Sequence, residues 1–275
     1  MLSACASDAL TPRHRKPDVL TRAQAWSLRP IAAGSFSLRA ALSPPAAHSE
    51  GAVLSLYLEG DGMAFLGPRE ISPDPTPSDP TALRLALQHP VNQGPVAWLA
   101  RPCHYLTPTQ MQRQCHPRLW TSHRFGEAAV AAMNQALDQL KAAYPEVQSL
   151  HLYGYSGGAA VALLLAARRD DVTRVTTIAG NLDHQTWSEG EHLAPLRGSL
   201  NPVDFVDRLR SIPQWHWVGA RDDVVPPYVA RRYMRALNSP RAHLRIMSAF
   251  DHHCCWAEQW PRLLGEQTQS AAAAR

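Results

Sequence analysis

A serine between glycines is the strongest chemical signal in the sequence. Residues 154–158 are Gly-Tyr-Ser-Gly-Gly. An apolar run that alternates with small and polar residues precedes them, and an alanine- and leucine-rich segment follows. This order predicts a strand, a sharp turn and a helix, with Ser156 in the turn and glycines where a Cβ atom would collide. The serine hydroxyl would then point into a cleft above a helix N-terminus, which suits a nucleophile whose reaction develops negative charge.

A serine hydroxyl is a weak nucleophile, so this chemistry requires a base, and the base requires an anion that fixes its tautomer. Asp222 follows a predicted strand that ends at Val218, and His252 follows another that ends near Ser248. Serine, acid and histidine therefore occur in one of the chain orders known for such a triad. The sequence predicts a Ser156, Asp222 and His252 triad.

Three segments together resemble the α/β-hydrolase superfamily. GYSGG at 154–158 is similar to its nucleophile elbow, GARDDVVP at 219–226 to its acid turn and AFDHHCCW at 249–256 to its histidine loop. The resemblance spans about residues 50–265. It implies the α/β-hydrolase fold and a serine hydrolase that cleaves carboxylic esters through an acyl-enzyme, with no cofactor. The motifs EGDG, RPC, GYSGG, GNLDH and HCCW also resemble those of an uncharacterised bacterial subgroup, often lipoproteins.

Two positions of the predicted triad have a neighbour of the same type. Asp222 matches the superfamily's acid turn better than Asp223, because the aspartate of that turn stands four residues before the proline. His252 is preferred to His253, although both lie in one loop and the register of the chain decides which faces inward.

The backbone donors for an oxyanion are expected from two loops. One is the amide of Gly157, directly after the nucleophile. The other is the amide of Asp61, with Gly62 as the second choice, in the loop that replaces the superfamily's His-Gly. A carboxylate there would oppose a forming anion, so Glu59 or Asp61 should pair with Arg101, unless both acids point to solvent.

The elements that must position these residues alternate between strand and helix. This alternation predicts a mostly parallel central sheet covered by helices on both faces, with ligands at the carboxyl ends of the strands. We expect a single α/β-hydrolase domain over residues 18–275. An irregular, cap-like insertion at residues 180–213 should follow the sixth strand.

The N-terminal region has a different character. Residues 1–17 are polar, basic and proline-containing, which predicts a disordered tether. A short helix is expected from Thr21, as N-cap, to Leu28, ending before Pro30. Residues 35–42 alternate in hydropathy, which is typical of a half-buried edge strand.

Five cysteines suggest an oxidising compartment. Setting Cys5 aside, Cys103 and Cys115 flank one loop and are candidates for a local disulfide, while free buried thiols are the alternative. Adjacent histidines and cysteines at 252–255 are poorly spaced for zinc, so no metal site is predicted there. A disulfide that anchors this loop is favoured. Leu2-Ser3-Ala4-Cys5 resembles the end of a lipoprotein signal, so Cys5 is either a lipidated residue that tethers the protein to a membrane or an accidental match.

Charge and composition limit the partners. The chain has 275 residues and a formal net charge of +4, with Lys and Arg scattered, which argues against nucleic acid. We expect a small-molecule or lipid-like ester as substrate and a location in the bacterial cell envelope, on the periplasmic side. A peptidase, an acyltransferase and a catalytically silent binding or envelope protein are the alternatives. The 67–80 loop and the 180–213 insertion should border the acyl pocket; its candidate aromatic residues are Tyr155, Trp187, Trp215 and Trp217, although the core is favoured for the last two.

Overall fold

The computed structural model describes residues 11–44 and 52–273, with side chains as far as Gln267. In this part of the chain eight strands form one sheet, in the order β1-β2-β4-β3-β5-β6-β7-β8. The strands from β4 to β8 in this order run parallel, and β1 and β2 pair antiparallel at one edge. Their bounds are β1 Ser27–Ala33, β2 Phe36–Leu42, β3 Ala52–Leu58, β4 Val96–Leu99, β5 Val147–Tyr155, β6 Val172–Ile178, β7 Gln214–Gly219 and β8 Ala242–Met247.

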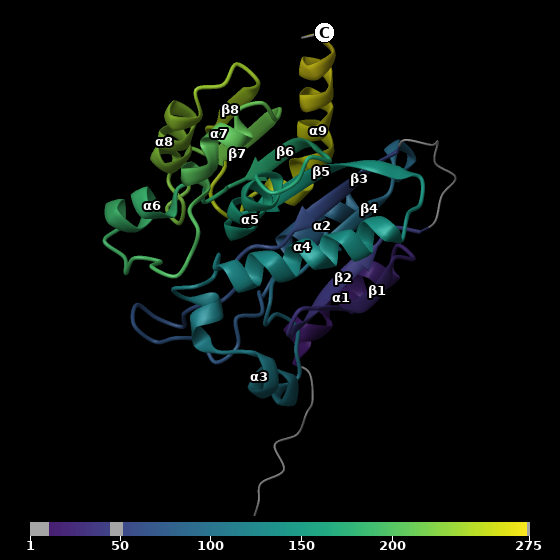
Figure 1. The fold of residues 1–275 in the computed structure, drawn as a ribbon, viewed down its shortest axis with the longest axis vertical. Helices are drawn as coiled ribbons and strands as arrows, with labels where there is room; N and C mark the ends of the chain where they lie inside the picture. Colours follow the sequence, from purple (N-terminus) through teal and green to yellow (C-terminus); the bar gives the residue numbers. More distant parts are fainter. Residues whose placement is uncertain (1–10, 45–51, 274–275) are drawn as a thin grey trace, which may run out of the picture.

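Helices cover both faces of this sheet (Figure 1). Residues of α4, α5 and α8 pack with one face, and residues of α2 and α9 pack with the other. The predicted mostly parallel sheet between two helical layers is therefore confirmed. The helices are α1 Pro12–Arg22, α2 Thr81–Leu87, α3 Pro108–Gln114, α4 Glu127–Ala142, α5 Gly157–Ala166, α6 His184–Gly190, α7 Val206–Leu209, α8 Pro227–Leu237 and α9 Trp256–Ala273, with 3-10 turns η1 Val91–Gln93, η2 Pro117–Trp120 and η3 Pro202–Phe205.

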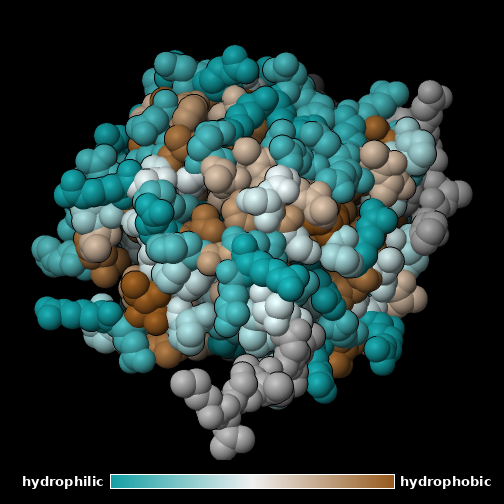
Figure 2. All heavy atoms as spheres, turned by 60° about the horizontal axis from the view of Figure 1, so that its bottom comes forward, coloured by the Kyte–Doolittle hydropathy of each residue, from teal (hydrophilic) through white to brown (hydrophobic). Residues whose placement is uncertain are grey.

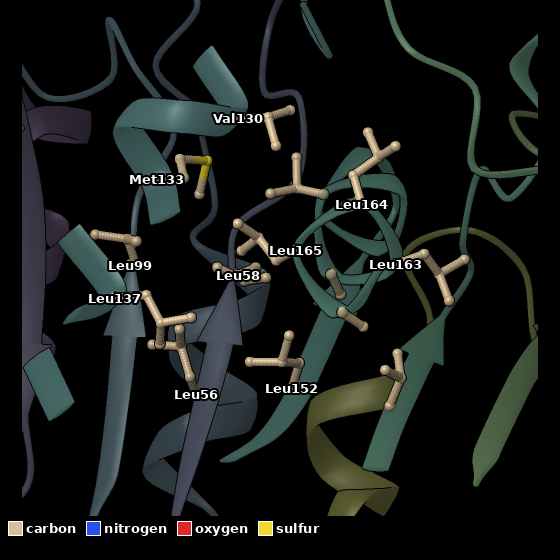
Figure 3. Close-up of a cluster of buried hydrophobic side chains, with 14 of the residues drawn as sticks. Leu56, Leu58, Leu99, Val130, Met133, Leu137, Leu152, Leu163, Leu164 and Leu165 are labelled. Carbon is tan, nitrogen blue, oxygen red and sulfur yellow. The ribbon is translucent and has the colours of Figure 1, made fainter. Parts of the chain in front are cut away.

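Leucine side chains fill the layer between the sheet and α4 and α5. Figure 3 shows labelled leucines of β3, β4 and β5 packed below Met133 and Leu137 of α4 and Leu165 of α5, whereas Leu164 points away from the strands. All ten residues of α5 are buried, because the helix is covered on every side. Each buried leucine contributes roughly 1.5–3 kcal/mol relative to an exposed one. This packing fixes the start of α5, and with it the turn at Ser156, against the sheet.

The N-terminal region differs from the expectation. Residues 1–10 lie outside the described part, but the predicted tether is wrong for residues 12–17, which form the first half of α1. The helix expected from Thr21 to Leu28 is also wrong, because α1 ends at Arg22 and β1 begins at Ser27. Consequently β1, and not the strand at 35–42, forms this edge of the sheet. Pro30 lies in β1, since an edge strand tolerates a residue without a backbone N–H.

The insertion after β6 is less irregular than expected. Residues 180–213 contain α6, η3 and α7, separated by turns. These elements are only four to seven residues long, too short for a hydrophobic period to mark them in the sequence.

One face of the molecule is mainly hydrophilic, with hydrophobic residues in small groups between polar ones (Figure 2). Among the described helices, none combines the length and the apolar character that crossing a bilayer requires.

Candidate active site

Ser156 lies in the tight turn between β5 and α5, as the sequence predicts. Its backbone has φ +52° and ψ −122°, a conformation that costs a non-glycine residue on the order of 1–3 kcal/mol. The surrounding glycines make the turn possible. A Cβ atom on Gly154 would lie 2.4 Å from the carbonyl oxygen of Gly158, and one on Gly158 would lie 2.3 Å from that of Leu58. The strained serine is thus held by close approaches that only glycine permits.

Asp222 and His252 meet Ser156 at the carboxyl ends of the strands. Nε2 of His252 lies 3.0 Å from Oγ of Ser156, and Nδ1 lies 2.9 and 3.0 Å from the two carboxylate oxygens of Asp222. Since a carboxylate only accepts hydrogen bonds, Nδ1 carries a proton and Nε2 is free to accept one from the serine. Asp223 and His253 are exposed. The structure therefore brings together the preferred member of each pair.

Both partners of the serine are held by their loops. Oδ1 of Asp222 accepts hydrogen bonds from the amides of Val224 and Val225, at 3.0 and 2.7 Å. The carbonyl oxygen of His252 accepts from the hydroxyl of Tyr155 at 2.9 Å and from the indole of Trp256 at 3.1 Å. Asp222 and His252 are each only 4% exposed. These contacts orient the imidazole before any substrate binds.

The carboxylate of Asp61 lies against Gly157, between two arginines. Arg101 and Arg124 each place a guanidinium nitrogen 3.0 Å from it. Burial alone would raise the pKa of Asp61, but these two cations hold it below its ordinary value. The predicted pairing with Arg101 is present, and Arg124 was not anticipated. His104 is hydrogen-bonded to the Asp61 backbone, and its burial lowers its pKa to about 3, so its ring is neutral at pH 7.

Glu59 is buried on the other side of Gly60. Its Oε1 accepts from the amides of Gly60 and Ala82 at 3.1 and 3.2 Å, and its Oε2 accepts from the amide of Leu83 at 3.4 Å and the indole of Trp98 at 2.9 Å. Burial nevertheless raises the pKa of Glu59 to about 7. Neither acid points to solvent, so that alternative is wrong. The two carboxylates instead hold the loop around Gly60 in place, Glu59 through its four N–H donors and Asp61 through its two arginines.

A cavity of about 640 Å³ opens in front of Ser156 and His252. Pro77 to Asp79 of the proline-rich loop line it, and so do Asn181 and Trp187 of the insertion. Both segments therefore border the cavity, as expected. Tyr155 also lines it, whereas Trp215 and Trp217 are 5% and 0% exposed and belong to the core. Arg124 and Asn181 also line the cavity, and neither was among the expected site residues. No motif surrounds Arg124, and Asn181 lies in the GNLDH segment, to which the sequence assigned no role.

Cysteines lie in two loops near the site. Cys103 and Cys115 form the predicted local disulfide, with their Cα atoms 5.8 Å apart. Cys254 and Cys255, directly after His253, are joined to each other. In the described part of the chain no three His, Cys, Asp or Glu side chains gather as a metal site requires.

Comparison with known proteins identifies the fold. No family model matches the sequence, and no curated protein matches it. Solved structures do. Est1E from Butyrivibrio proteoclasticus is 16% identical, with a TM-score of 0.60 over 90% of this chain and 99% of that chain. The putative α/β hydrolase ATU1826 from Agrobacterium tumefaciens is 15% identical, with a TM-score of 0.57 over 90% and 95%.

Esterases and peptidases both occur among the similar structures. An acylaminoacyl peptidase is 11% identical, with a TM-score of 0.64 over 89% of this chain and 41% of that chain. Identities this low bear on architecture and not on substrate. The sheet order, the helices on both faces and these similar structures agree: the chain has the α/β-hydrolase fold.

Proposed function

We propose that the protein is a serine hydrolase that cleaves carboxylic esters through an acyl-enzyme. The observation that carries the proposal is the line of contacts from Ser156 to His252 to Asp222, at 3.0 and 2.9 Å, at the edge of an open cavity. A strained serine on a glycine turn, a buried carboxylate and an oriented imidazole have little structural use unless the hydroxyl is to react.

In the proposed reaction Oγ of Ser156 attacks the ester carbonyl carbon while Nε2 of His252 takes the hydroxyl proton. Asp222 stabilises the imidazolium that forms. The amides of Gly157 and Asp61 donate to the oxyanion. When the tetrahedral intermediate collapses, the bond to the alcohol breaks and His252 protonates the departing oxygen. A water molecule then gives a proton to His252 and attacks the acyl-enzyme, which releases the acid and restores the serine.

The first test is hydrolysis of p-nitrophenyl esters from acetyl to palmitoyl by the wild type and by Ser156→Ala. We expect Ser156→Ala to lower kcat by on the order of 10⁴-fold or more. A fluorophosphonate should label the wild type at Ser156 and leave the variant unlabelled. Full activity of a folded Ser156→Ala protein would refute the proposal.

A peptidase or an acyltransferase would use the same three residues, whereas a catalytically silent protein would not use them in a reaction. A peptidase or an acyltransferase differs only in the leaving group or the acceptor, so peptide p-nitroanilides and added alcohols in the same assay separate them from an esterase. A silent binding or envelope protein would neither turn over any ester nor react with the fluorophosphonate. The intact contacts of His252 favour an active enzyme over that alternative.

We also propose that the protein works in the bacterial cell envelope, on the periplasmic side, with Cys5 as its lipid attachment point. Cys5 lies outside the described residues, so the resemblance of residues 2–5 to a lipoprotein signal supports the attachment. The Cys103 and Cys115 pair supports an oxidising compartment. Mass spectrometry of the N-terminal peptide from fractionated cells tests both statements, and an unmodified Cys5 in a cytosolic protein would contradict them.

A further inference from the structure

The guanidinium of Arg124, which lines the cavity, has one terminal nitrogen without a partner in the described part of the chain. Nε of Arg124 donates to the carbonyl oxygen of Thr121 at 2.9 Å, and Nη1 donates to Asp61 at 3.0 Å. The guanidinium also lies over the ring of Trp187, 6.0 Å from its centroid. The other terminal nitrogen, Nη2, has no hydrogen-bond partner among residues 11–44 and 52–267, and Arg124 lines the cavity. A rigidly held cation thus presents unused donor capacity beside the serine.

A second unpaired polar group lines the same cavity. Asn181 follows β6, and its backbone amide donates to the carbonyl oxygen of Ser156 at 3.2 Å. The residue is only 2% exposed, yet Oδ1 has no partner in the described part of the chain. None of the described residues bonds its Nδ2 either, so the amide can turn its donor end toward a bound group. Because a carboxylate only accepts hydrogen bonds, Nδ2 is the atom of this amide that would pair with one.

The acids around the cavity do not cancel this cation. Asp61 is shared by Arg101 and Arg124, which leaves one positive charge in excess. Asp79 at the rim is likewise matched by Lys16 and Arg84. Glu59 is 1% exposed, and its oxygens accept hydrogen bonds from four N–H donors. The cavity wall is therefore suited to an anion.

We propose that the cavity selects esters whose acyl chain ends in a carboxylate, which Arg124 binds with help from Asn181. This inference rests on the proposed ester hydrolysis. The charge is assigned to the acyl part because the alcohol must leave toward His252, which protonates it. Arg124 instead lies next to the proposed oxyanion site, because it is bonded to the Asp61 carboxylate that packs against Gly157. Arg124 is thus a specificity-determining residue, since a guanidinium and a carboxylate form a strong, oriented hydrogen bond.

The test compares two esters with the same number of carbons, mono-p-nitrophenyl adipate, which is an anion, and p-nitrophenyl hexanoate, which is neutral. A shorter diacid is avoided because its carboxylate would attack its own ester. Hydrolysis by Ser156→Ala gives the background rate. We expect the wild type to have a kcat/KM about tenfold or more higher for the adipate ester. Arg124→Gln should bring the ratio of the two kcat/KM values to about one or below.

Arg168→Gln is the matched control, because it removes one positive charge from an exposed pair with Glu127 away from the cavity. The ratio of the kcat/KM values for the adipate and hexanoate esters should be the same in Arg168→Gln as in the wild type. If Arg124→Gln loses activity toward both esters, inhibition of the wild type decides: monomethyl adipate should compete against hexanoate hydrolysis about tenfold better than methyl hexanoate. Equal inhibition, or a wild-type ratio of one or less with serine-dependent turnover, overturns the carboxylate inference alone. Absence of any serine-dependent turnover overturns the proposed function itself.

Discussion

Replacing Gly157 by alanine tests how closely the fold and the proposed oxyanion site depend on each other. A Cβ atom there would lie 2.1 Å from Oδ1 and 2.3 Å from Cγ of Asp61, whereas real Cβ atoms essentially never approach a neighbour within 3.0 Å. The carboxylate must therefore retreat by at least 0.9 Å, the difference between 3.0 and 2.1 Å. It cannot retreat freely, because Arg101 and Arg124, both buried, hold it at 3.0 Å.

Two effects of Gly157→Ala follow from this displacement. Weakening a buried ion pair costs up to about 3–5 kcal/mol, and with about 2–4 °C per kcal/mol for a domain near this size, calorimetry should show a marked fall in Tm. The amides of Gly157 and Asp61 also move apart. A 1 Å misplacement of such groups lowers catalysis by about 10²-fold, so kcat for p-nitrophenyl acetate should fall by at least that factor.

Gly265→Ala is the control for this experiment. Gly265 lies in a helix, as Gly157 does, but a Cβ atom there meets nothing within 4 Å. We expect it to keep full activity and to gain up to about 1 kcal/mol, since alanine is the better helix former. A Gly157→Ala protein with the wild-type Tm and kcat would refute the packing of Asp61 on Gly157. It would also refute the proposed role of the Gly157 and Asp61 amides in binding the oxyanion.

Two further changes probe the same loop. Because the pKa of Glu59 is raised from 4.5 to about 7, the folded state binds a proton more tightly than the unfolded chain. The resulting stabilisation is complete below pH 4.5 and is lost as the pH rises through 7. The free energy of unfolding, from denaturant titrations, should therefore fall by about 3 kcal/mol over this range, and Glu59→Gln should remove that part of the slope; an identical slope in the variant would contradict the assignment. Gly62→Ala should lower Tm and esterase activity, since Gly62 has φ +68° and a Cβ atom would lie 2.0 Å from the carbonyl oxygen of Pro75; Gly67→Ala, in open space in the same loop, should change neither.

Much of the fold and of the candidate site could be predicted because the signals are local. The turn at Ser156 is specified by its own glycines, and the strand before it and the helix after it are apolar in recognisable patterns. Asp222 and His252 could be placed because each follows a strand, and parallel strands deliver their carboxyl ends to one edge. The choice between adjacent aspartates came from the spacing to Pro226.

The predictions at the N-terminus were wrong because the structure there depends on contacts between residues far apart in the sequence. Helix α1 has few apolar residues, so no hydrophobic period marks it, and contacts far along the chain hold it in place. Asp18 bonds Arg39 at 2.8 Å, and Arg13 bonds Asp74 at 2.6 Å. Strand β1 contains Pro30, which suggested the end of a helix, and only its pairing with β2 shows that it is an edge strand.

The net charge around the loop at residues 59–62 could not be predicted from the sequence, because it depends on partners far along the chain. Taken alone, two acids beside an expected oxyanion site predict repulsion. The fold removes it by giving the acids different partners: Glu59 receives four N–H donors, and Asp61 receives Arg101 and Arg124. Arg124 lies 63 residues further along the chain, in a turn without a motif. Arg101 and Arg124 together carry one more charge than the Asp61 carboxylate that they share. A loop whose sequence suggests a negative site therefore lies in a cluster with an excess positive charge, and this reversal of sign leads us to expect an anionic acyl group.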